Sequence, residues 1–224
     1  MLLGGDFYDV VEGADGWVHA MVGDVCGHGP DEAALGVSMR VAWRTMILAA
    51  HGGSDTGSEA LTTIDQVFAH ERYRPSLFTT LCMLSIDPTR STGRLYLAGH
   101  PPPLLITSAG VRPVETRRRT PIGVGNGTQW PSGEMALGEA WSVLMYTDGL
   151  IEGRVGPGDD RLDVHGLVTL VESVLQTGAP DVGPGERNER LLDEVIGRVR
   201  ELNGGDLDDD LAVVALGWNP KGGG

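Results

Sequence analysis

The stretch Gly-Gly-Asp-Phe-Tyr-Asp at residues 4–9 says most about the fold of this chain. We expect it to form an acidic turn, and three further aspartate-bearing turns at strand ends follow it, at residues 23–29 (GDVCGHG), 146–149 (YTDG) and 208–211 (DDDL). Each places a carboxylate beside glycine or at the edge of an apolar strand, where the backbone can come close to an ion. Hard divalent cations prefer carboxylate, carbonyl and water oxygens. The four turns together therefore predict an oxygen-ligand site for Mg²⁺ or Mn²⁺ in a shared cleft.

The composition limits the class of protein. With 224 residues, of which 41% are hydrophobic, the chain is long enough for one globular domain with a sizeable core. The formal net charge of −14 argues against nucleic acid or an anionic membrane as the main partner, since both attract cationic surfaces. No apolar run reaches the about 20 residues of a membrane span, and two cysteines, Cys26 and Cys82, do not make a disulfide framework. We therefore expect a cytoplasmic protein.

The order of β-rich runs and helical patterns indicates an α+β fold. Strands are predicted at residues 17–23, 78–86, 94–98, 103–107, 142–147 and 211–217. Apolar residues at helical spacing predict four helices, marked by Leu35, Met39, Ala42 and Met46, by Leu61, Ile64 and Val67, by Leu167, Leu170 and Val174, and by Leu192, Val195, Val199 and Leu202. The first of them begins at Pro30-Asp31-Glu32. This order favours a sandwich of two antiparallel sheets flanked by helices over a parallel βαβ sheet.

We expect a single domain at residues 1–219, followed by an uninformative tail at 220–224. The start is abrupt, because Met1-Leu2-Leu3 runs directly into the acidic stretch and leaves little of the strand that should lead into it. We therefore expect the N-terminal edge to have been cut from a longer chain.

Five motifs stand out along the chain, and all but the third contain aspartate: GGDFYD at 4–9, GDVCGHG at 23–29, AGHPPPLL at 98–105, YTDGLIE at 146–152 and DDDLAVV at 208–214. Taken in order, they resemble the protein phosphatase 2C-like PPM family, and within it the bacterial stage II sporulation E (SpoIIE) branch. The resemblance covers the chain from residue 4 to about 216. It implies a four-layer α/β-β/α sandwich with a metal centre at one edge of the paired sheets, and a sensory or receiver domain upstream.

The resemblance also implies a role for five residues. Asp24 would bridge two ions, Mn²⁺ or Mg²⁺, and Asp148 and Asp209 would complete one of them. Val25 would offer its backbone carbonyl to the second ion, and Asp6 would hold that ion directly or through water. Asp209 lies between two other aspartates, so its selection rests on alignment with the family motif.

The function that the resemblance implies is metal-dependent protein serine/threonine phosphatase activity. A water that bridges two divalent cations has a lowered pKa and attacks phosphorus in line, so no side-chain nucleophile is required. The implied substrate is phosphoserine or phosphothreonine on a small anti-anti-sigma-like regulatory protein. Two alternatives stay open. The chain could be a catalytically weak module that keeps the fold and sequesters a partner, or a hydrolase of small phosphates, although it has no Gly-rich nucleotide loop ending in Lys-Ser/Thr.

Other polar residues favour structural roles. We expect Cys26 to be a small loop residue, and His100, before three prolines, to shape a tight turn. For His28, in a Gly-His-Gly turn, a structural role is favoured over proton donation to a leaving serine oxygen. The basic cluster at 117–119 is either a solvated loop or a contact for phosphate or an acidic partner. Turn or cap roles are predicted for Asp9, Asp15, Asp87 and Asp159, and surface or core roles for His51, His70 and His165.

Overall fold

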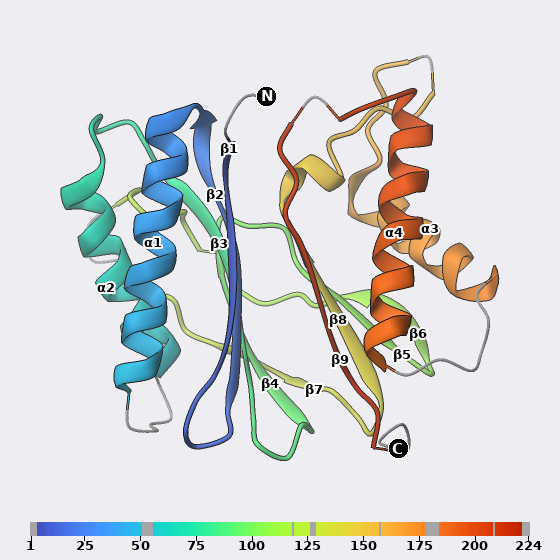
Figure 1. Ribbon diagram of the computed structural model, residues 1–224, viewed down its shortest axis with the longest axis horizontal. Helices are drawn as coiled ribbons and strands as arrows, with labels where there is room; N and C mark the ends of the chain where they lie inside the picture. The colour runs from blue at the N-terminus through green and yellow to red at the C-terminus, as the bar shows by residue number, and fades with distance from the viewer. Residues whose placement is uncertain are drawn as a thin grey trace. The chain divides into compact units, whose positions relative to one another are not determined.

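The computed structural model describes residues 4–50, 56–117, 119–125, 129–156, 158–177, 184–207 and 209–220 (Figure 1). The chain forms two compact units. Unit 1 comprises Met1–Pro101 and Glu115–Ala136, and unit 2 comprises Pro102–Val114 and Leu137–Gly224. His51, Arg118 and Asp208 lie outside the described residues, as do residues 1–3, on which the predicted N-terminal edge rests, and 221–224 of the predicted tail.

Unit 1 is built on a five-stranded antiparallel sheet with the strand order β1-β2-β3-β4-β7. Two helices, α1 and α2, connect β2 to β3 and lie beside the sheet (Figure 1). The bounds of these elements are Gly4–Glu12 for β1, Val18–His28 for β2, Pro30–Ala49 for α1, Thr56–Glu71 for α2, Thr79–Ile86 for β3, Thr92–Ala98 for β4 and Gly133–Ala136 for β7.

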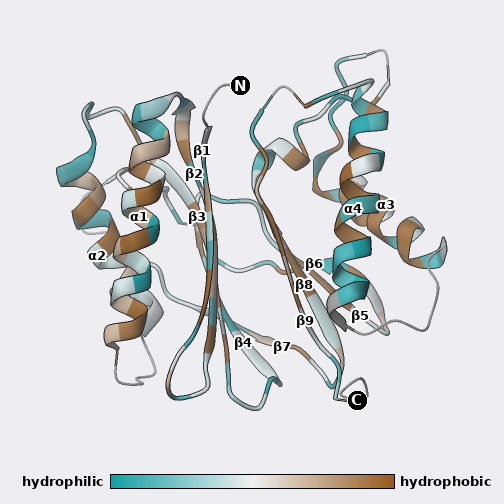
Figure 2. Ribbon diagram, viewed as in Figure 1, coloured by the Kyte–Doolittle hydropathy of each residue, from teal (hydrophilic) through white to brown (hydrophobic). Residues whose placement is uncertain are grey.

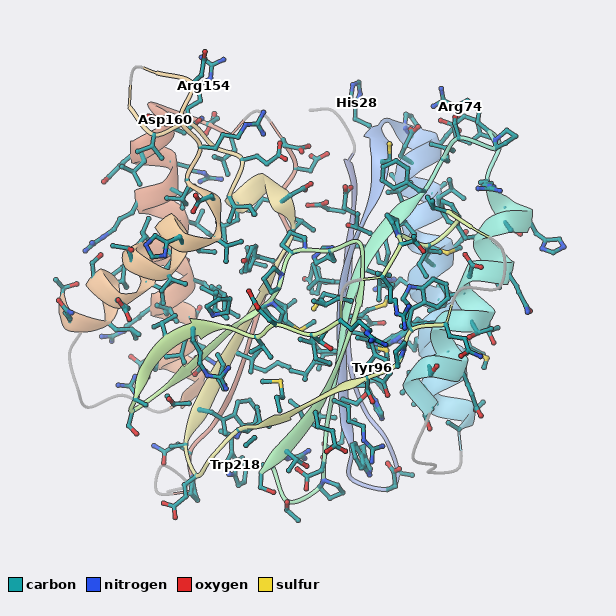
Figure 3. All side chains as sticks on the ribbon, turned by 180° about the vertical axis from the view of Figure 1, so that it is seen from behind. His28, Arg74, Tyr96, Arg154, Asp160 and Trp218 are labelled. Carbon is teal, nitrogen blue, oxygen red and sulfur yellow. The ribbon has the colours of Figure 1, made fainter. Side chains whose placement is uncertain are left out.

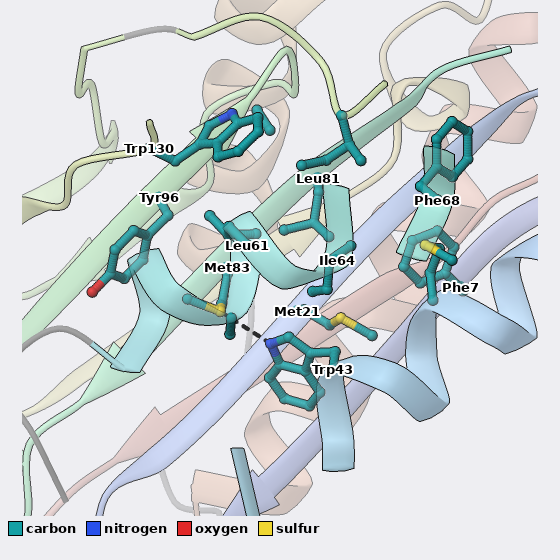
Figure 4. Close-up of a cluster of buried hydrophobic side chains, with 14 of the residues drawn as sticks. Phe7, Met21, Trp43, Leu61, Ile64, Phe68, Leu81, Met83, Tyr96 and Trp130 are labelled. Atoms are coloured by element: carbon teal, nitrogen blue, oxygen red, sulfur yellow. Dashed lines mark hydrogen bonds between the residues drawn. The ribbon is translucent and has the colours of Figure 1, made fainter. Parts of the chain in front are cut away.

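The core of unit 1 lies between the two helices and one face of this sheet. Leu35, Met39, Trp43 and Ile47 recur every four residues along α1 and are all buried, which is the pattern of an amphipathic helix. They share one apolar cluster with side chains of α2 and of strands β1 to β4 (Figure 4). The Trp43 indole Nε1–H also donates to the Met83 sulfur at 3.0 Å, which fixes α1 against β3.

Unit 2 pairs a four-stranded antiparallel sheet, ordered β6-β5-β8-β9, with helices α3 and α4. One apolar cluster joins side chains of both helices to the sheet. In Figure 2 apolar and hydrophilic residues alternate along α4, as expected of a helix with one buried face. The bounds are Leu104–Thr107 for β5, Gly110–Pro113 for β6, Trp141–Tyr146 for β8, Asp148–Leu150 for the 3₁₀ helix η1, Asp163–Thr177 for α3, Pro184–Asn203 for α4 and Val213–Trp218 for β9.

The predicted class is confirmed: two antiparallel sheets flanked by helices. The six predicted strands and four predicted helices are all present, with boundaries that differ by a few residues. None of the helices in the described ranges is both long and apolar enough to cross a membrane.

The prediction of a turn at residues 4–9 is wrong. Residues Gly4–Glu12 form strand β1, and β2 continues past its predicted end at residue 23 to His28. The glycines were misleading because they serve a close approach between strands rather than a chain reversal. The predicted turn role of Asp9 is also wrong, since Asp9 points to the helix face of β1 and is bound by Arg44 of α1. Two short strands, β6 and β7, carry too few β-rich residues to be predicted.

Candidate metal centre

Two aspartates of unit 1 stand directly opposite each other on neighbouring strands. Asp6 of β1 pairs in register with Asp24 of β2, and Asp24 pairs with Thr80 of β3. Directly opposite residues in an antiparallel pair have Cβ atoms about 4.5–5.5 Å apart on the same face of the sheet. Like charges in such a pair repel, and a divalent cation bound beside the carboxylates would offset this repulsion.

A β-bulge follows immediately and reshapes the backbone at Val25. The register passes from Asp6 opposite Asp24 to Gly4 opposite His28, so that only Gly5 on β1 faces residues 25–27 of β2. A Cβ built on Gly5 would stand 2.3 Å from the Val25 carbonyl oxygen. The bulge therefore brings this carbonyl against β1 beside the aspartate pair, and glycine at position 5 is what permits it.

Strand β3 holds Asp24 from the other side. The Thr79 hydroxyl donates to the Asp24 carbonyl oxygen at 2.7 Å, and Thr79 is fully buried. The Thr80 side chain shares a 2.8 Å hydrogen bond with Nδ1 of His100, which is also buried. His100 is thus a buried support behind Thr80, a role that the tight-turn prediction missed. Its place in the Gly-His-Pro stretch after a strand gives no sign of this partner, because the pairing depends on the sheet register.

The N-terminus of α1 closes over the bulge through Glu32. This buried carboxylate accepts a hydrogen bond from the Tyr73 hydroxyl and lies 3.5 Å from an Arg74 nitrogen. The hydrogen bond from Tyr73 lowers the pKa of Glu32, against the opposing effect of burial. Cβ atoms at Gly27 and Gly29 would lie 3.3 and 3.1 Å from the Glu32 carboxylate oxygens. Residues 27–29 are therefore packed against an ionised side chain.

Of the two other candidates in this segment, Cys26 does not have the properties of a nucleophile. Burial first, and then the charge of Asp24, raises the pKa of the Cys26 thiol, which stays protonated. His28 ends β2 and is exposed at one end of the unit, near Arg74 (Figure 3).

In unit 2, strands β8 and β9 bring Asp148 beside Asp209. Asp148 begins the 3₁₀ helix after β8, and Asp209 lies shortly before β9. Thr147 ties the two segments together, because its hydroxyl accepts from the Ala212 N–H at 2.9 Å and its own N–H donates to the Ala212 carbonyl at 3.0 Å. A Cβ on Gly149 would lie 2.1 Å from the Asp210 carbonyl oxygen, so this approach again requires glycine.

The electrostatics of this half also favour a cation. Burial raises the pKa of Asp148 above its ordinary value of 3.8, and the negative charges of Glu152 and Asp209 raise it further. A cavity of about 300 Å³ opens beside these carboxylates, with Arg154 and Arg161 among the residues in its walls. An ionised Asp148 is therefore disfavoured in this environment unless positive charge approaches it.

The structure thus brings together three predicted residues in unit 1, Asp6, Asp24 and Val25, and two in unit 2, Asp148 and Asp209. Within the described residues, no group of three or more His, Cys, Asp or Glu side chains is arranged to hold a metal ion. Each unit nevertheless fits a hard cation, because each has paired carboxylates beside a backbone carbonyl. The carbonyl of Val25 lies close to Gly5, and the carbonyl of Asp210 lies close to Gly149. In the basic cluster, the Arg119 carbonyl accepts a hydrogen bond from the Gly99 N–H at 2.8 Å, and the buried Arg119 Nε has no acceptor among the residues that the structure describes.

These two units define a protein of the PP2C phosphatase fold. The PP2C phosphatase domain of SpoIIE from Bacillus subtilis superposes with a TM-score of 0.74 at 21% identity, over 96% of this chain and 58% of that one. A family model described as stage II sporulation protein E (SpoIIE) matches residues 14–219, and the chain belongs to this family.

Two further relatives extend the comparison. The crystal structure of the RsbU and RsbW domains of a Mycobacterium tuberculosis protein has a TM-score of 0.76 at 32% identity, over 95% of this chain and 56% of that one. The phosphoserine phosphatase RsbP of Bacillus subtilis (strain 168) is 24% identical over 159 residues, which are 67% of this chain and 37% of RsbP. The chain therefore spans between about one third and three fifths of the length of these relatives.

Proposed function

We propose that this protein is a metal-dependent serine/threonine protein phosphatase. Its substrate in this proposal is phosphoserine or phosphothreonine on a small anti-anti-sigma-like regulatory protein. The observation that carries the proposal is the facing pair Asp6 and Asp24 beside the Val25 bulge, because two carboxylates and a backbone carbonyl at one place are the oxygen ligands that a hard divalent cation prefers. Membership of the SpoIIE family and the likeness to RsbP, which is named a phosphoserine phosphatase, support the choice of reaction.

Five residues supply the metal ligands in this proposal. Asp24, Asp6 and the Val25 carbonyl would hold one divalent ion, Mn²⁺ or Mg²⁺. Asp148 and Asp209 would hold a second ion of the same kind. When bound, the ions activate a water for attack on phosphorus and neutralise charge on the phosphate.

The side chains around these ligands keep them in place. Thr79 holds the backbone of Asp24, and Thr147 holds the turn that carries Asp148. The protonated thiol of Cys26 is a poor nucleophile, which agrees with attack by water rather than by a side chain. In unit 2, the wall of the cavity beside Asp209 contains Arg154 and Arg161 together with acidic residues, and Arg161 forms an ion pair with Glu152.

Regulation by a sensory or receiver domain and a cytoplasmic location belong to the same proposal. Both cysteines, Cys26 and Cys82, are free thiols, which suits a reducing compartment.

Turnover of a phosphoserine-bearing regulatory protein, measured as released phosphate, tests the proposal. We expect turnover with Mn²⁺ or Mg²⁺, none in EDTA, recovery when Mn²⁺ is restored, and no turnover of ATP under the same conditions. Full activity in EDTA would exclude the metal mechanism. Tight binding of the phosphoprotein without any release of phosphate in Mn²⁺ would favour the sequestering module, and faster turnover of nucleotides than of phosphoprotein would favour the small-phosphate hydrolase.

A further inference from the structure

The bulge beside the candidate metal ligands has two ends. At one end Asp6 pairs with Asp24, and at the other Gly4 pairs with His28, the last residue of β2. Within the described residues the β1–β2 ladder goes no further than this second pair. The contacts that residues 27–29 make with the rest of unit 1 therefore decide whether the bulge keeps its shape.

The position of the Val25 carbonyl depends on both sides of β2. The Cys26 N–H donates to the Phe78 carbonyl at 3.0 Å, on the side of β3. Because this peptide group is planar and trans, the Val25 carbonyl points the opposite way, toward Gly5 of β1. Strand β3 thus sets the direction of the carbonyl, whereas its place beside Asp6 depends on how β1 and β2 stay together across the bulge.

Residues 27–29 cannot hold this shape through their own backbone preferences. Gly27 and Gly29 have φ angles of 107° and 140°, in the region that favours glycine. Glycine adopts many conformations at similar energy, so a segment with two of them takes its shape from the groups that pack against it. Glu32 supplies such a contact, since its carboxylate oxygens lie 3.3 and 3.1 Å from where Cβ atoms at Gly27 and Gly29 would be.

Glu32 is itself held by side chains from outside α1. Its buried carboxylate accepts a hydrogen bond from the Tyr73 hydroxyl and lies 3.5 Å from an Arg74 nitrogen. The Arg74 guanidinium also donates to the Tyr73 hydroxyl at 2.8 Å and lies 4.8 Å from the centre of the Tyr73 ring. In Figure 3 Arg74 lies at the same end of unit 1 as His28. The segment after α2 is therefore connected through Glu32 to residues 27–29.

One turn further along α1, Gly36 makes a second close approach to the bulge. A Cβ at Gly36 would lie 3.1 Å from the Gly5 carbonyl oxygen. Residues four apart lie on the same face of a helix, so this face of α1 contacts both strands, β1 at Gly5 and β2 at residues 27–29. Glu32 thus fixes the turn of α1 that lies against the bulge.

We propose that Glu32 is a positioning residue for the metal centre, which holds residues 27–29 so that the Val25 carbonyl stays beside Asp6. Since this carbonyl is a ligand only under the proposed function, the role of Glu32 rests on that function. Glu32 acts through residues 27–29 and not as a ligand, and Tyr73 keeps its carboxylate in place. Loss of this contact releases the far end of the bulge and lowers the affinity for the ion.

Binding of Mn²⁺, followed by loss of the electron paramagnetic resonance signal of the free ion, tests this role without turnover. Glu32→Ala should weaken binding about tenfold or more, as is typical when a partner of a metal ligand is replaced. Glu32→Gln keeps the length of the side chain and an oxygen that accepts from Tyr73, so it should recover most of the affinity. Tyr73→Phe removes one hydrogen bond from an exposed ring and should have an intermediate effect. Asp31→Ala, which removes an exposed acid from the same turn, is the control and should bind Mn²⁺ as the unchanged protein does.

Release of phosphate from a phosphoserine protein separates positioning from general damage to the fold. The Mn²⁺ concentration for half-maximal activity should rise in Glu32→Ala and Tyr73→Phe, while the KM for the phosphoprotein in saturating Mn²⁺ should stay unchanged. A KM that rises in saturating Mn²⁺, or variants that bind Mn²⁺ as tightly as the unchanged protein, would overturn the role of Glu32 alone. If Glu32→Ala does not fold, the same comparison with Tyr73→Phe decides. An unchanged protein that binds no Mn²⁺ would overturn the proposed metal centre and the role of Glu32 with it.

Discussion

The carbonyl oxygen of Val25 occupies the space that a side chain at Gly5 would need, since a Cβ there would lie 2.3 Å away. A Cβ atom essentially never lies within 3.0 Å of a heavy atom from a residue that is not its neighbour in the chain. The contact arises because one residue of β1 faces three residues of β2 at the bulge. The contact thus joins Gly5 to the Val25 carbonyl, which we propose as a metal ligand.

Gly5→Ala should therefore impair metal binding. The added methyl must displace the Val25 carbonyl or separate the strands, at a cost of about 1–3 kcal/mol in the free energy of unfolding. The Mn²⁺ concentration for half-maximal phosphatase activity should rise, measured alongside a urea unfolding curve. Gly197→Ala is the control: a Cβ at this position of α4 has no neighbour within 4 Å, and alanine should stabilise the helix by about 0.5–1 kcal/mol. Equal behaviour of the two variants would contradict the role of Gly5.

Substitutions can distinguish three of the proposed ligands, Asp24, Asp148 and Asp209, from a neighbouring carboxylate that does not bind metal. Asp24→Asn, Asp148→Asn and Asp209→Asn should each reduce kcat by more than the about 10–100-fold that is typical of residues next to a metal's ligands. The circular dichroism spectrum should stay unchanged. Asp210→Asn is the matched control and should have a much smaller effect, because the Asp210 backbone carbonyl, which the substitution retains, is the group that lies against Gly149. An essential Asp210 with a dispensable Asp209 would move the ligand by one residue.

The sequence predicted most elements of the fold because their signals are local. The helices α1 to α4 follow from apolar residues at steps of three and four, such as Leu35 and Met39, which are buried together. The long strands follow from continuous β-rich runs. Strand β1 was missed because two glycines and two aspartates hide its alternation, and only the tertiary partner Arg44 explains a buried charge at Asp9.

The contacts that position the candidate ligands could not be predicted from local sequence patterns. The motifs pointed to Asp6 and Asp24, but their direct opposition depends on the register of the bulged β1–β2 pair. The hydrogen bond between Thr80 and His100 joins residues 20 positions apart, and neither belongs to an acidic motif. Such contacts are set by strand pairing, and a single sequence contains no local signal for them.

The ion pair between the buried Asp9 and the half-exposed Arg44 should stabilise unit 1. Burial raises the pKa of Asp9, but hydrogen bonds from Arg44 and the Val10 N–H and the charges of Arg44 and Arg40 outweigh it, so the pKa falls below its ordinary value of 3.8. Arg44→Ala should lower the free energy of unfolding at pH 7, because the buried Asp9 carboxylate loses the hydrogen bonds from the guanidinium and keeps the one from the Val10 N–H. Arg40→Ala, which removes charge but no hydrogen bond to Asp9, should cost less.

The pH dependence of the Arg44→Ala effect follows from the direction of that shift. A depressed pKa contributes stability that is present above the unfolded value and is lost as the pH falls through the folded value. The difference between the unchanged protein and Arg44→Ala should therefore be constant near pH 7 and shrink below 3.8, the ordinary value for Asp9. Urea unfolding at a series of pH values measures it. A difference that grows in acid would show that Asp9 is not the partner responsible.

The raised pKa of Asp148 predicts the opposite behaviour. Because burial, Glu152 and Asp209 raise this pKa above 3.8, the folded state binds the proton more tightly than the unfolded state, and the ionised group costs stability above the folded pKa. Asp148→Asn should therefore melt at a higher temperature than the unchanged protein at pH 7 in EDTA. The gain should shrink as the pH falls through the folded pKa and vanish below 3.8. In saturating Mn²⁺ the unchanged protein should instead have the higher melting temperature, since only the carboxylate is stabilised by the cation. Asp159→Asn, which changes an exposed neighbouring carboxylate, should leave the melting temperature unchanged both in EDTA and in Mn²⁺. An Asp148→Asn protein that melts at a lower temperature than the unchanged protein in EDTA would exclude this electrostatic account of the site.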